Sequence, residues 1–411
     1  MIDKVKIGVI GLGRRGSALL YVLLAFDDVE VAACCDTYLD RAKDNAKIVF
    51  EKKKNIPFVT TDYKEVLNMK EIDAVLISTA WEYHAEIAIA AMENKKIVAL
   101  EVGGAYTIQD CWDLVKTYER TKTPFMFMEN CCYAKSELLV TAMARKGKFG
   151  KIVHCSGAYA HDLRKEITFG KENRHYRLRN YISRNCENYP THALGPIAKL
   201  LDINRGNRMV SLVSVASKAE GLHQFILENK EKVEPSLLTQ RFSQGDIVYT
   251  IITCADGETI TLKLDTTLPR YYAREFTVRG TKGLYEQNAN MVFIEGEQEE
   301  EYWEAVDTYQ KHINNAKNYE QEFLPDMWKN IKEEDIKAGH GGTDVFTFKA
   351  FINAIKNNEE MPIDIYDAVS WMSITCLSEE SIAHGGAPIA IPDFTCGKWL
   401  TRPRKDVINF N

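Results

Sequence analysis

A glycine-rich turn near the N-terminus constrains this chain more than any other feature. Val5–Ile10 is a short β-branched apolar run, as expected for a strand that is buried on both faces. The motif Gly-Leu-Gly-Arg-Arg-Gly begins directly after it, and Ser17–Phe26 then has the pattern of an apolar helix. Gly11 permits a tight turn, Gly13 lets backbone amides approach a pyrophosphate, and Gly16 lets the helix pack on the strand. This order predicts a dinucleotide-binding unit, whereas a glycine turn without a ligand is the alternative.

An acidic residue follows the second expected strand and selects between cofactors. Val29–Cys34 reads as that strand, and Asp36 lies about twenty residues past the glycine loop, where a carboxylate can bind both ribose hydroxyls. The same carboxylate repels a 2′-phosphate. We therefore expect NAD rather than NADP.

Strand and helix patterns continue to alternate through the first third of the chain. This alternation predicts an α/β fold, an N-terminal Rossmann domain with a doubly wound parallel sheet. The expected strands are Ile72–Ser78, Lys96–Leu100 and Pro124–Met128, and the expected helices are His84–Asn94 and Ile108–Thr121.

Polar or aromatic residues follow three of these strand ends. Trp81 and His84 follow the first, Glu101-Val102 the next, and Glu129-Asn130 the last. Each could be only a loop residue or a helix cap. Because the carboxyl ends of parallel strands share one edge of the sheet, we expect them to surround the nicotinamide and its ribose.

The pattern changes after about Ala134, where strand-like runs separated by turn signals begin to dominate. We expect residues 1–133 to form the NAD-binding domain. Residues 134–411 should form an α+β domain with an open, mostly antiparallel sheet, and its C-terminal helices should pack back on the first domain. The expected strands are Lys151–Tyr159, Met209–Ala216, Ile247–Cys254, Thr259–Leu264, Glu275–Arg279 and Met291–Ile294; the expected helices are one ending at Ala144, then Tyr189–Leu201, Val345–Lys356 and Tyr366–His384.

Three segments between these elements have simpler interpretations. His161–Arg184 reads as a charged, aromatic loop, and Glu295–Glu301 as a solvated acidic turn. Gly339–Asp344 could be a site loop, but a turn followed by a Thr or Asp helix cap is the preferred interpretation.

Composition limits the class of protein. The 411 residues are 45% hydrophobic and 27% charged with a net charge of -6, which disfavours nucleic acid or an anionic membrane as the main partner. The ten cysteines lack Cys-x-x-Cys spacing, so we expect reduced thiols and no metal. No signal peptide or long apolar run is visible, which predicts a cytoplasmic protein.

A set of short motifs across nearly the whole chain resembles one family. Together with the two-domain pattern, these motifs resemble the Gfo/Idh/MocA oxidoreductase superfamily and, within it, the NAD-dependent α-N-acetylgalactosaminidases of glycoside hydrolase family 109. The motifs are Trp81-x-x-His84, Glu101-Val102, Glu129-Asn130, Tyr159-x-His161, Arg177, Tyr189-Pro190-Thr191-His192 and Tyr271.

The resemblance implies two groups of site residues. NAD would be held by Arg14, Arg15, Asp36, Trp81, His84, Glu101, Val102 and Asn130, and the sugar site would be lined by Tyr159, Arg177, Tyr189, Pro190, Thr191, His192 and Tyr271. Ala80 departs from the proline common before the cofactor loop. The leader of many secreted relatives is also absent, which suggests an imported carbohydrate substrate.

Residue chemistry then suggests roles. A tightly bound, recycled NAD would take hydride from C3 of the sugar and return it after the C1 bond has been broken by C2 deprotonation, elimination and water addition. We assign the proton of the C3 hydroxyl to His192, because imidazole titrates near neutral pH. Tyr159 is assigned to the C2 proton, which requires a positive environment because a free phenol titrates near pH 10. His161 would relay protons.

Three alternatives stay open at this point. A plain NAD-dependent sugar or inositol dehydrogenase is disfavoured because such enzymes usually carry lysine where Val102 stands. A non-enzymatic NAD-binding regulator would not need the histidine and tyrosine cluster. The segment from Tyr189 to His192 could also be only a helix start capped by Thr191. A homodimer or homotetramer is expected from the open sheet face.

Overall fold

The computed structural model describes residues 4–298 and 305–410. Contacts within the chain divide it into two compact units. The first unit comprises Met1–Asn130, Arg174–Tyr176 and Ile331–Cys376, and the second comprises Cys131–Asn173, Arg177–Asn330 and Leu377–Asn411. The sequence boundary was expected between residues 133 and 134. The two units are therefore not continuous segments, since two later stretches of chain join the first.

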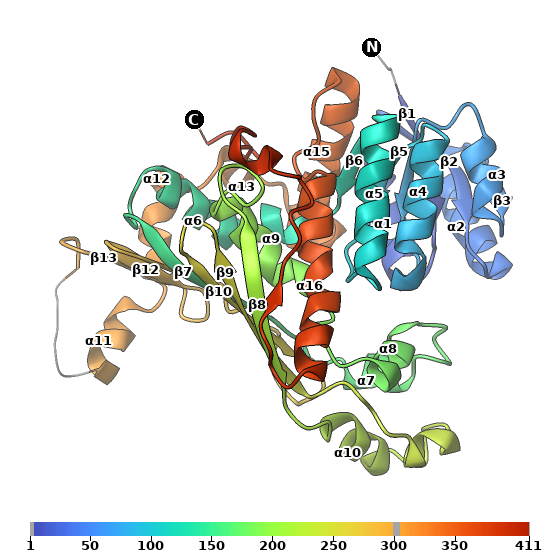
Figure 1. The fold of residues 1–411 in the computed structure, drawn as a ribbon. Helices are drawn as coiled ribbons and strands as arrows, with labels where there is room; N and C mark the ends of the chain where they lie inside the picture. Colours follow the sequence, from blue (N-terminus) through green and yellow to red (C-terminus); the bar gives the residue numbers. More distant parts are fainter. Residues whose placement is uncertain (1–3, 299–304, 411) are drawn as a thin grey trace. The chain divides into compact units, whose positions relative to one another are not determined.

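The first unit is built on a parallel sheet with the strand order β3-β2-β1-β4-β5-β6 (Figure 1). Its neighbouring strands all pair in parallel. The order reverses between β1 and β4, the place where doubly wound sheets bind ligands. This confirms the expected Rossmann-type fold. The strands are β1 (Val5–Ile10), β2 (Val29–Cys35), β3 (Phe58–Thr60), β4 (Ala74–Ile77), β5 (Ile97–Leu100) and β6 (Phe125–Phe127).

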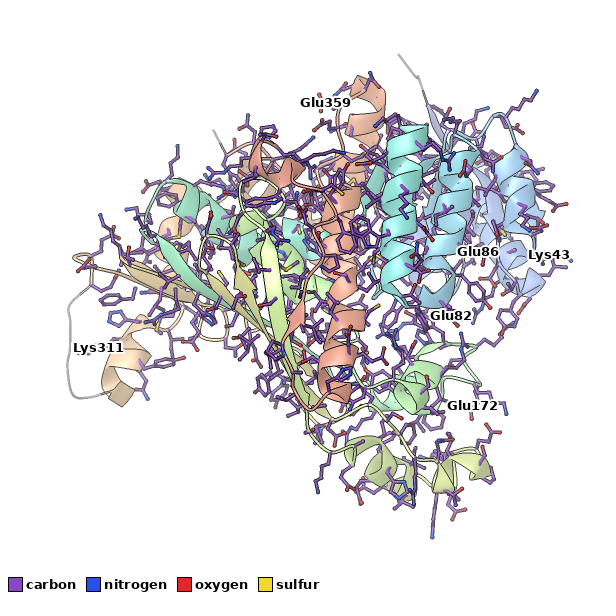
Figure 2. The ribbon with its side chains drawn as sticks, in the orientation of Figure 1. Lys43, Glu82, Glu86, Glu172, Lys311 and Glu359 are labelled. Carbon is purple, nitrogen blue, oxygen red and sulfur yellow. The ribbon has the colours of Figure 1, made fainter. Side chains whose placement is uncertain are left out.

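The helices of the first unit connect these strands, and several have clear local causes. α5 begins with a capping box in which Thr107 and Asp110 satisfy each other's backbone amides. α2 carries exposed Lys43 and α4 carries exposed Glu86, both labelled in Figure 2. The helices are α1 (Arg14–Leu23), α2 (Leu39–Lys53), α3 (Tyr63–Asn68), η1 (Trp81–Tyr83), α4 (His84–Glu93), α5 (Ile108–Thr121), α14 (Glu333–Ala338), η5 (His340–Gly342), α15 (Thr343–Asn357) and the first part of α16 (Ile365–Ala383).

The second unit is built on a mixed sheet with the order β13-β12-β11-β7-β10-β9-β8-β14. β7 and β10 pair in parallel and the other described neighbours are antiparallel, which confirms the expected open, mostly antiparallel sheet. The strands are β7 (Ile152–Ala160), β8 (Met209–Ala216), β9 (Ile247–Cys254), β10 (Thr259–Asp265), β11 (Thr277–Gly280), β12 (Gly283–Glu286), β13 (Met291–Ile294) and β14 (Ile389–Ala390). Residues 295–298 form a turn, and the rest of the predicted acidic turn lies outside the described residues.

The helices in the described part of the second unit include six that the sequence did not predict, namely α7, α8, α10, α11, α12 and α13. The expected loop from His161 to Arg184 contains α7 and α8, so that prediction was wrong for this stretch. The helices are α6 (Lys135–Arg145), α7 (Arg164–Thr168), α8 (Arg177–Ser183), α9 (Thr191–Leu200), α10 (Gly221–Glu228), α11 (Ala305–His312), α12 (Glu320–Phe323) and α13 (Asp326–Lys329), with short 3-10 turns η2 (Asn130–Tyr133), η3 (Pro235–Thr239), η4 (Asn315–Tyr319) and η6 (Lys398–Leu400).

A close contact between β7 and α9 positions the first turn of α9. A Cβ added to Gly157 of β7 would lie 3.0 Å from the Cβ of Ala193 in α9. Glycine at this position therefore lets the first turn of α9 approach the carboxyl half of β7.

Two further features bear on the class of protein. None of the helices in the described ranges is long and apolar enough to cross a membrane. None of the ten cysteines forms a disulfide in the part of the chain that the structure describes, and burial raises the pKa of the Cys34 and Cys35 thiols to about 12.

Candidate active site

The glycine loop of the first unit has the shape that a dinucleotide pyrophosphate requires. Gly11 adopts φ +91°, and a Cβ there would lie 2.7 Å from the backbone of Ser78. A Cβ on Gly16 would lie 1.9 Å from the carbonyl oxygen of Gly11, so only glycine fits where α1 meets the loop. Gly13 is the N-cap of α1, and no side chain in the described residues caps this end. A helix N-terminus at this point of the loop favours a phosphate through its backbone amides and its dipole.

The acid predicted for the ribose is held in place by backbone amides. One oxygen of Asp36 accepts a hydrogen bond from Leu12 N at 2.7 Å, and the other accepts from Tyr38 N at 2.8 Å. These bonds fix the carboxylate at the end of β2, beside the glycine loop. The position fits recognition of a ribose diol.

Arg15 is the centre of a buried ion-pair network. Its guanidinium donates to Glu101 Oε1 at 2.8 and 3.0 Å, and to both oxygens of Asp344 at 2.8 Å. Asn130 Nδ2 donates to Asp344 Oδ1 at 2.7 Å, and Glu101 Oε2 accepts from Val102 N at 2.9 Å. Four residues predicted to hold NAD therefore belong to one network, with Asp344 as an additional member.

The charges in this network stabilise one another. Burial alone would lower the pKa of Arg15, but the carboxylates of Glu101 and Asp344 raise it overall. Burial would likewise raise the pKa of Asp344, but hydrogen bonds from Arg15 and His340 hold it well below its usual range. Both groups are charged at neutral pH, and their mutual hydrogen bonds hold the network in place.

Asp344 corrects a prediction made from the sequence. The turn and helix expected around Gly339–Asp344 are present, but the N-cap of α15 is Gly342 and no described side chain caps it. Asp344 instead turns its carboxylate to Arg15. The signal available in the sequence was an acid in the first turn of a helix directly after a glycine-rich turn.

The residues at the end of β4 form an apolar contact with the segment after β5. Trp81 is 5% exposed, and its ring leaves room only for glycine at position 103, because a Cβ there would lie 2.4 Å from Trp81 Cδ1. His84 is buried with Nε2 3.1 Å from the carbonyl of Thr79, and burial lowers its pKa to about 4. The imidazole is therefore neutral at physiological pH.

Three of the remaining predicted cofactor residues lie close to this edge of the sheet. Val102 is buried directly after β5 and offers no charge, while Glu129 is fully buried beside Asn130. Arg14 is the first residue of α1 and is exposed. The first unit offers the N-terminus of α1 for a phosphate, Asp36 for a ribose, and the hydrogen-bonded network around Arg15. This set of groups fits NAD.

A cluster of aromatic rings marks the second unit. The rings of Tyr159 and Tyr189 lie 4.3 Å apart, and His192 lies 5.6 Å from the first and 4.8 Å from the second. Tyr159 is near the end of β7 and His192 is the second residue of α9, so the contact depends on the close approach at Gly157. Both tyrosines are nearly buried, whereas His192 is half-buried.

His161 extends this cluster away from β7. Its Nδ1 lies 3.4 Å from the hydroxyl of Tyr159, and its ring packs edge-on to Tyr272 at 5.3 Å. Desolvation raises the pKa of the Tyr272 hydroxyl to about 12, although 54% of the residue is exposed. Tyr271, the residue predicted for the sugar site, is 94% exposed. The structure thus brings Tyr272 rather than Tyr271 to the cluster.

Arg177 supplies the positive charge of this cluster. The guanidinium lies over the ring of Tyr189, with Cζ 5.1 Å from the centroid, and Nε is 2.8 Å from Glu166 Oε1. Arg177 is 8% exposed and begins α8. The predicted sugar residues Tyr159, Arg177, Tyr189 and His192 therefore form one contiguous group with His161.

The first turn of α9 lacks the side-chain cap by Thr191 that the sequence left open. Pro190 is the N-cap position and makes no such bond, and the buried hydroxyl of Thr191 has no hydrogen-bond partner in the described residues. Glu187, just before this turn, is fully buried, and desolvation raises its pKa to about 8 even though Tyr189 N donates to its carboxylate. The turn that carries His192 is thus held by backbone and by a buried acid.

The two units together define a class of protein. A parallel sheet with a dinucleotide loop and a second α+β unit with acid/base groups is the architecture of NAD-binding oxidoreductases. The profile of an oxidoreductase family with an NAD-binding Rossmann fold matches residues 5–128, and that of the glycosyl hydrolase 109 C-terminal domain matches residues 133–401. The chain belongs to glycoside hydrolase family 109 and is an NAD-dependent enzyme of that family.

Relatives cover nearly the full length. A glycosyl hydrolase family 109 protein of Stenotrophomonas maltophilia is 40% identical over 434 residues, covering 99% of this chain and 92% of that protein. An alpha-N-acetylgalactosaminidase of Tannerella forsythia is 35% identical, covering 97% of this chain and 87% of that protein. Both are similar along the segments that carry the two clusters.

Solved structures share the fold at low identity. A levoglucosan dehydrogenase in complex with NADH and levoglucosan superimposes with a TM-score of 0.71 at 19% identity, covering 95% of this chain and 100% of that one. A myo-inositol 2-dehydrogenase from Lactobacillus plantarum gives 0.65 at 15% identity, with coverage of 95% and 100%. At these identities the likeness concerns the fold alone.

Proposed function

We propose that this protein hydrolyses small α-N-acetylgalactosaminides in the cytoplasm, with no net redox change, no metal and a recycled NAD. The observation that carries the proposal is a contrast between the two units. At the end of β5 the cofactor unit has the buried, uncharged Val102, while the second unit gathers an imidazole and two phenols within ring contact. Acid/base chemistry is thus available from His192 and Tyr159.

NAD⁺, when bound, would supply a temporary acceptor for the C3 hydride, which makes the C2 proton acidic until the hydride returns. His192 takes the proton of the C3 hydroxyl, a role that imidazole suits near neutral pH. Tyr159 removes the proton from C2, and the bond from C1 to the leaving group then breaks, which leaves a double bond between C1 and C2. Water adds across this double bond, with its oxygen at C1 and a proton returned to C2. His161, whose Nδ1 is 3.4 Å from the Tyr159 hydroxyl, accepts or returns that proton.

The remaining residues of the cluster bind and orient the sugar. Arg177, with its guanidinium over the ring of Tyr189, donates to sugar or acetamido oxygens. Tyr189 packs between Arg177 and Tyr159 and orients both side chains toward the sugar. Tyr272 offers a hydroxyl on the other side of His161, and exposed Tyr271 remains a second candidate for this contact.

Catalysis of this kind needs no pair of carboxylates at the separation typical of other glycosidases. Two acids of the second unit are already engaged in other ways, because Glu166 is paired with Arg177 and Glu187 is buried with a raised pKa. We further propose a homodimer or homotetramer as the working form.

The testing experiment uses p-nitrophenyl α-N-acetylgalactosaminide, purified protein and NAD⁺ without an external reductant, in the presence of EDTA. Nitrophenolate release and absorbance at the NADH band are followed together. Many turnovers of nitrophenolate without accumulating NADH are expected. NADH accumulation without nitrophenolate would instead identify a sugar dehydrogenase, and neither signal with a range of glycosides would overturn enzymatic action on this substrate class.

A further inference from the structure

We propose that Arg174–Tyr176 is a strap that closes over the bound dinucleotide and slows its release. These three residues belong to the compact first unit, although the chain on both sides of them belongs to the second. The strap deepens the proposed function, since a redox-neutral cycle requires the reduced cofactor to stay in place between two half-reactions. The contacts of Arg174 with Asp40, Tyr38 and Arg41 and of Tyr176 with Trp81 lie within the first unit.

The first attachment is at the adenosine end of the expected cofactor site. Arg174 donates to both carboxylate oxygens of Asp40, at 3.0 and 2.7 Å, and its guanidinium lies 4.5 Å from the centroid of Tyr38. Tyr38 is itself tied to the ribose acid, because its backbone amide donates to Asp36. The strap therefore begins beside the residue that recognises the ribose.

The second attachment is above the phosphate loop. Arg41 Nη2 donates to the carbonyl oxygen of Arg174 at 3.4 Å, and its guanidinium lies 5.0 Å from the ring centroid of Tyr38. The other guanidinium nitrogen, Nη1, is 3.5 Å from the place where a Cβ on Gly13 would stand. One arginine thus reaches both the strap backbone and the N-cap of α1, where the pyrophosphate is expected.

The third attachment is at the other side of the site. The ring of Tyr176 packs edge-on to Trp81 at 4.9 Å, and His175 stacks on Tyr176 at 4.7 Å with 18° between the planes. Trp81 starts the turn after β4 and is a predicted nicotinamide-side residue. Glu82, labelled in Figure 2, follows it and accepts a hydrogen bond from Tyr106.

The strap reaches across one strand of the parallel sheet. Asp40 follows β2, Trp81 follows β4, and β1 lies between these strands. Neighbouring strands are about 4.8 Å apart, so the crossing is roughly 10 Å. Arg174 lies in a turn with φ +51°, so the backbone of these three residues is not fully extended, and the side chains of Arg174 and Tyr176 make the contacts at the two ends. The strap therefore crosses the carboxyl end of β1, which is the switch point where a dinucleotide binds.

The strap is fastened by contacts that can open. Arg174 and Asp40 are exposed side chains, and exposed ion pairs contribute little one at a time. An aromatic edge contact at Trp81 adds a second independent attachment. A fastening of this kind admits the cofactor slowly during loading, yet three attachments must open together before it leaves.

The test measures cofactor release without any glycoside. Protein loaded with NAD⁺ is freed of excess cofactor by gel filtration and diluted into ethanol and alcohol dehydrogenase, which convert each released NAD⁺ into a signal at 340 nm. The variants are Arg174→Ala, Asp40→Ala and Tyr176→Ala. The controls are Tyr176→Phe, which keeps the ring contact, and Arg120→Ala, which removes another exposed arginine–carboxylate pair, with Glu93, in the same unit.

We expect release to be about two- to fivefold faster in Arg174→Ala, Asp40→Ala and Tyr176→Ala, because each attachment contributes little by itself, and unchanged in Tyr176→Phe and Arg120→Ala. Because Arg174 and Asp40 form one attachment, the double variant should release NAD⁺ no faster than either single variant. Wild-type release rates in both Arg174→Ala and Asp40→Ala would overturn the strap. A wild-type protein that retains NAD⁺ but does not cleave glycosides would contradict the proposed function and leave the strap supported.

Discussion

The polar cluster of the first unit and the aromatic cluster of the second are stabilised by different kinds of interaction. The first unit surrounds the expected cofactor with charges, and Arg15, Glu101 and Asp344 hold one another through direct hydrogen bonds. The second unit gathers rings, and its Tyr159, Tyr189 and His192 meet through faces and edges. One cluster is fixed by directional bonds and the other by packing.

The difference follows from the ligand that each cluster serves. A dinucleotide carries fixed charges and ribose hydroxyls, which suit rigid polar groups whose own charges are balanced. A sugar presents apolar faces and hydroxyls that must gain and lose protons, which suits aromatic surfaces and weakly acidic groups. The polar cluster should therefore control stability and affinity, and the aromatic cluster should control rate.

The largest expected effect is in the aromatic cluster. His192→Ala removes the imidazole that takes the C3 hydroxyl proton, and we expect activity to fall by roughly 10³–10⁴-fold, at the upper end for general acid/base groups. NAD content should be unchanged. Turnover of the p-nitrophenyl glycoside is measured beside NAD extracted per protein, with His384→Ala, an exposed histidine at the end of α16, as control. A loss no larger than that in the control would contradict the assigned role.

Tyr159→Phe should separate hydride transfer from C3 from release of the leaving group at C1. Hydride transfer from C3 should persist, while release of the leaving group should fall by about 10²–10³-fold because the C2 proton is no longer removed. A single-turnover experiment follows the NADH band and nitrophenolate together. In heavy water the wild-type product should gain deuterium at C2, and product without deuterium would exclude elimination.

Asp344→Asn tests the polar cluster. One negative charge is removed from a buried network, but Glu101 still faces Arg15, so we expect a loss of about 2–3 kcal/mol in the unfolding free energy, near the lower end for buried pairs. NAD affinity should fall because Arg15 and Asn130 are then held less firmly. Denaturant unfolding and NAD titration measure the two effects. Glu93→Gln, at an exposed pair in the same unit, should change stability much less.

The last prediction concerns the pH dependence of stability. Glu187 has a pKa near 8 when folded but an ordinary value near 4.3 when unfolded, so the folded state holds a proton that the unfolded state has lost. Stability should therefore fall as pH rises from about 4.5 to 8. Thermal unfolding should show Glu187→Gln gaining roughly a few °C on the wild type between pH 5 and pH 8. An equal pH dependence in both proteins would show that Glu187 is ionised in the fold.

Much of the fold was readable from local patterns. The bounds of α5, β1, β8, β9 and β13 were predicted as the structure has them, because continuous apolar or alternating runs end in clear turn signals. Shorter and more polar elements were missed. α2 is mostly charged, and its buried positions Ala42, Ala46 and Val49 are few, while β3 is only three residues long.

The site residues that belong to short sequence motifs were predicted. Those that pair with residues far away in the sequence were missed. Tyr159, Tyr189 and His192 came from short motifs and meet in space. Asp344 and Arg174 act on residues more than a hundred positions away, and no local pattern encodes such a pairing. Adjacent side chains outside a helix point in different directions, so the sequence could not choose between Tyr271 and Tyr272.

The strap has a consequence for the cell. An enzyme that keeps one cofactor molecule for many turnovers does not sample the ratio of oxidised to reduced nicotinamide in its surroundings. Its rate would then stay the same whatever that ratio is, and it would not draw on a shared pool of cofactor. Opening the strap by mutation should make glycoside cleavage depend on the redox state of the medium.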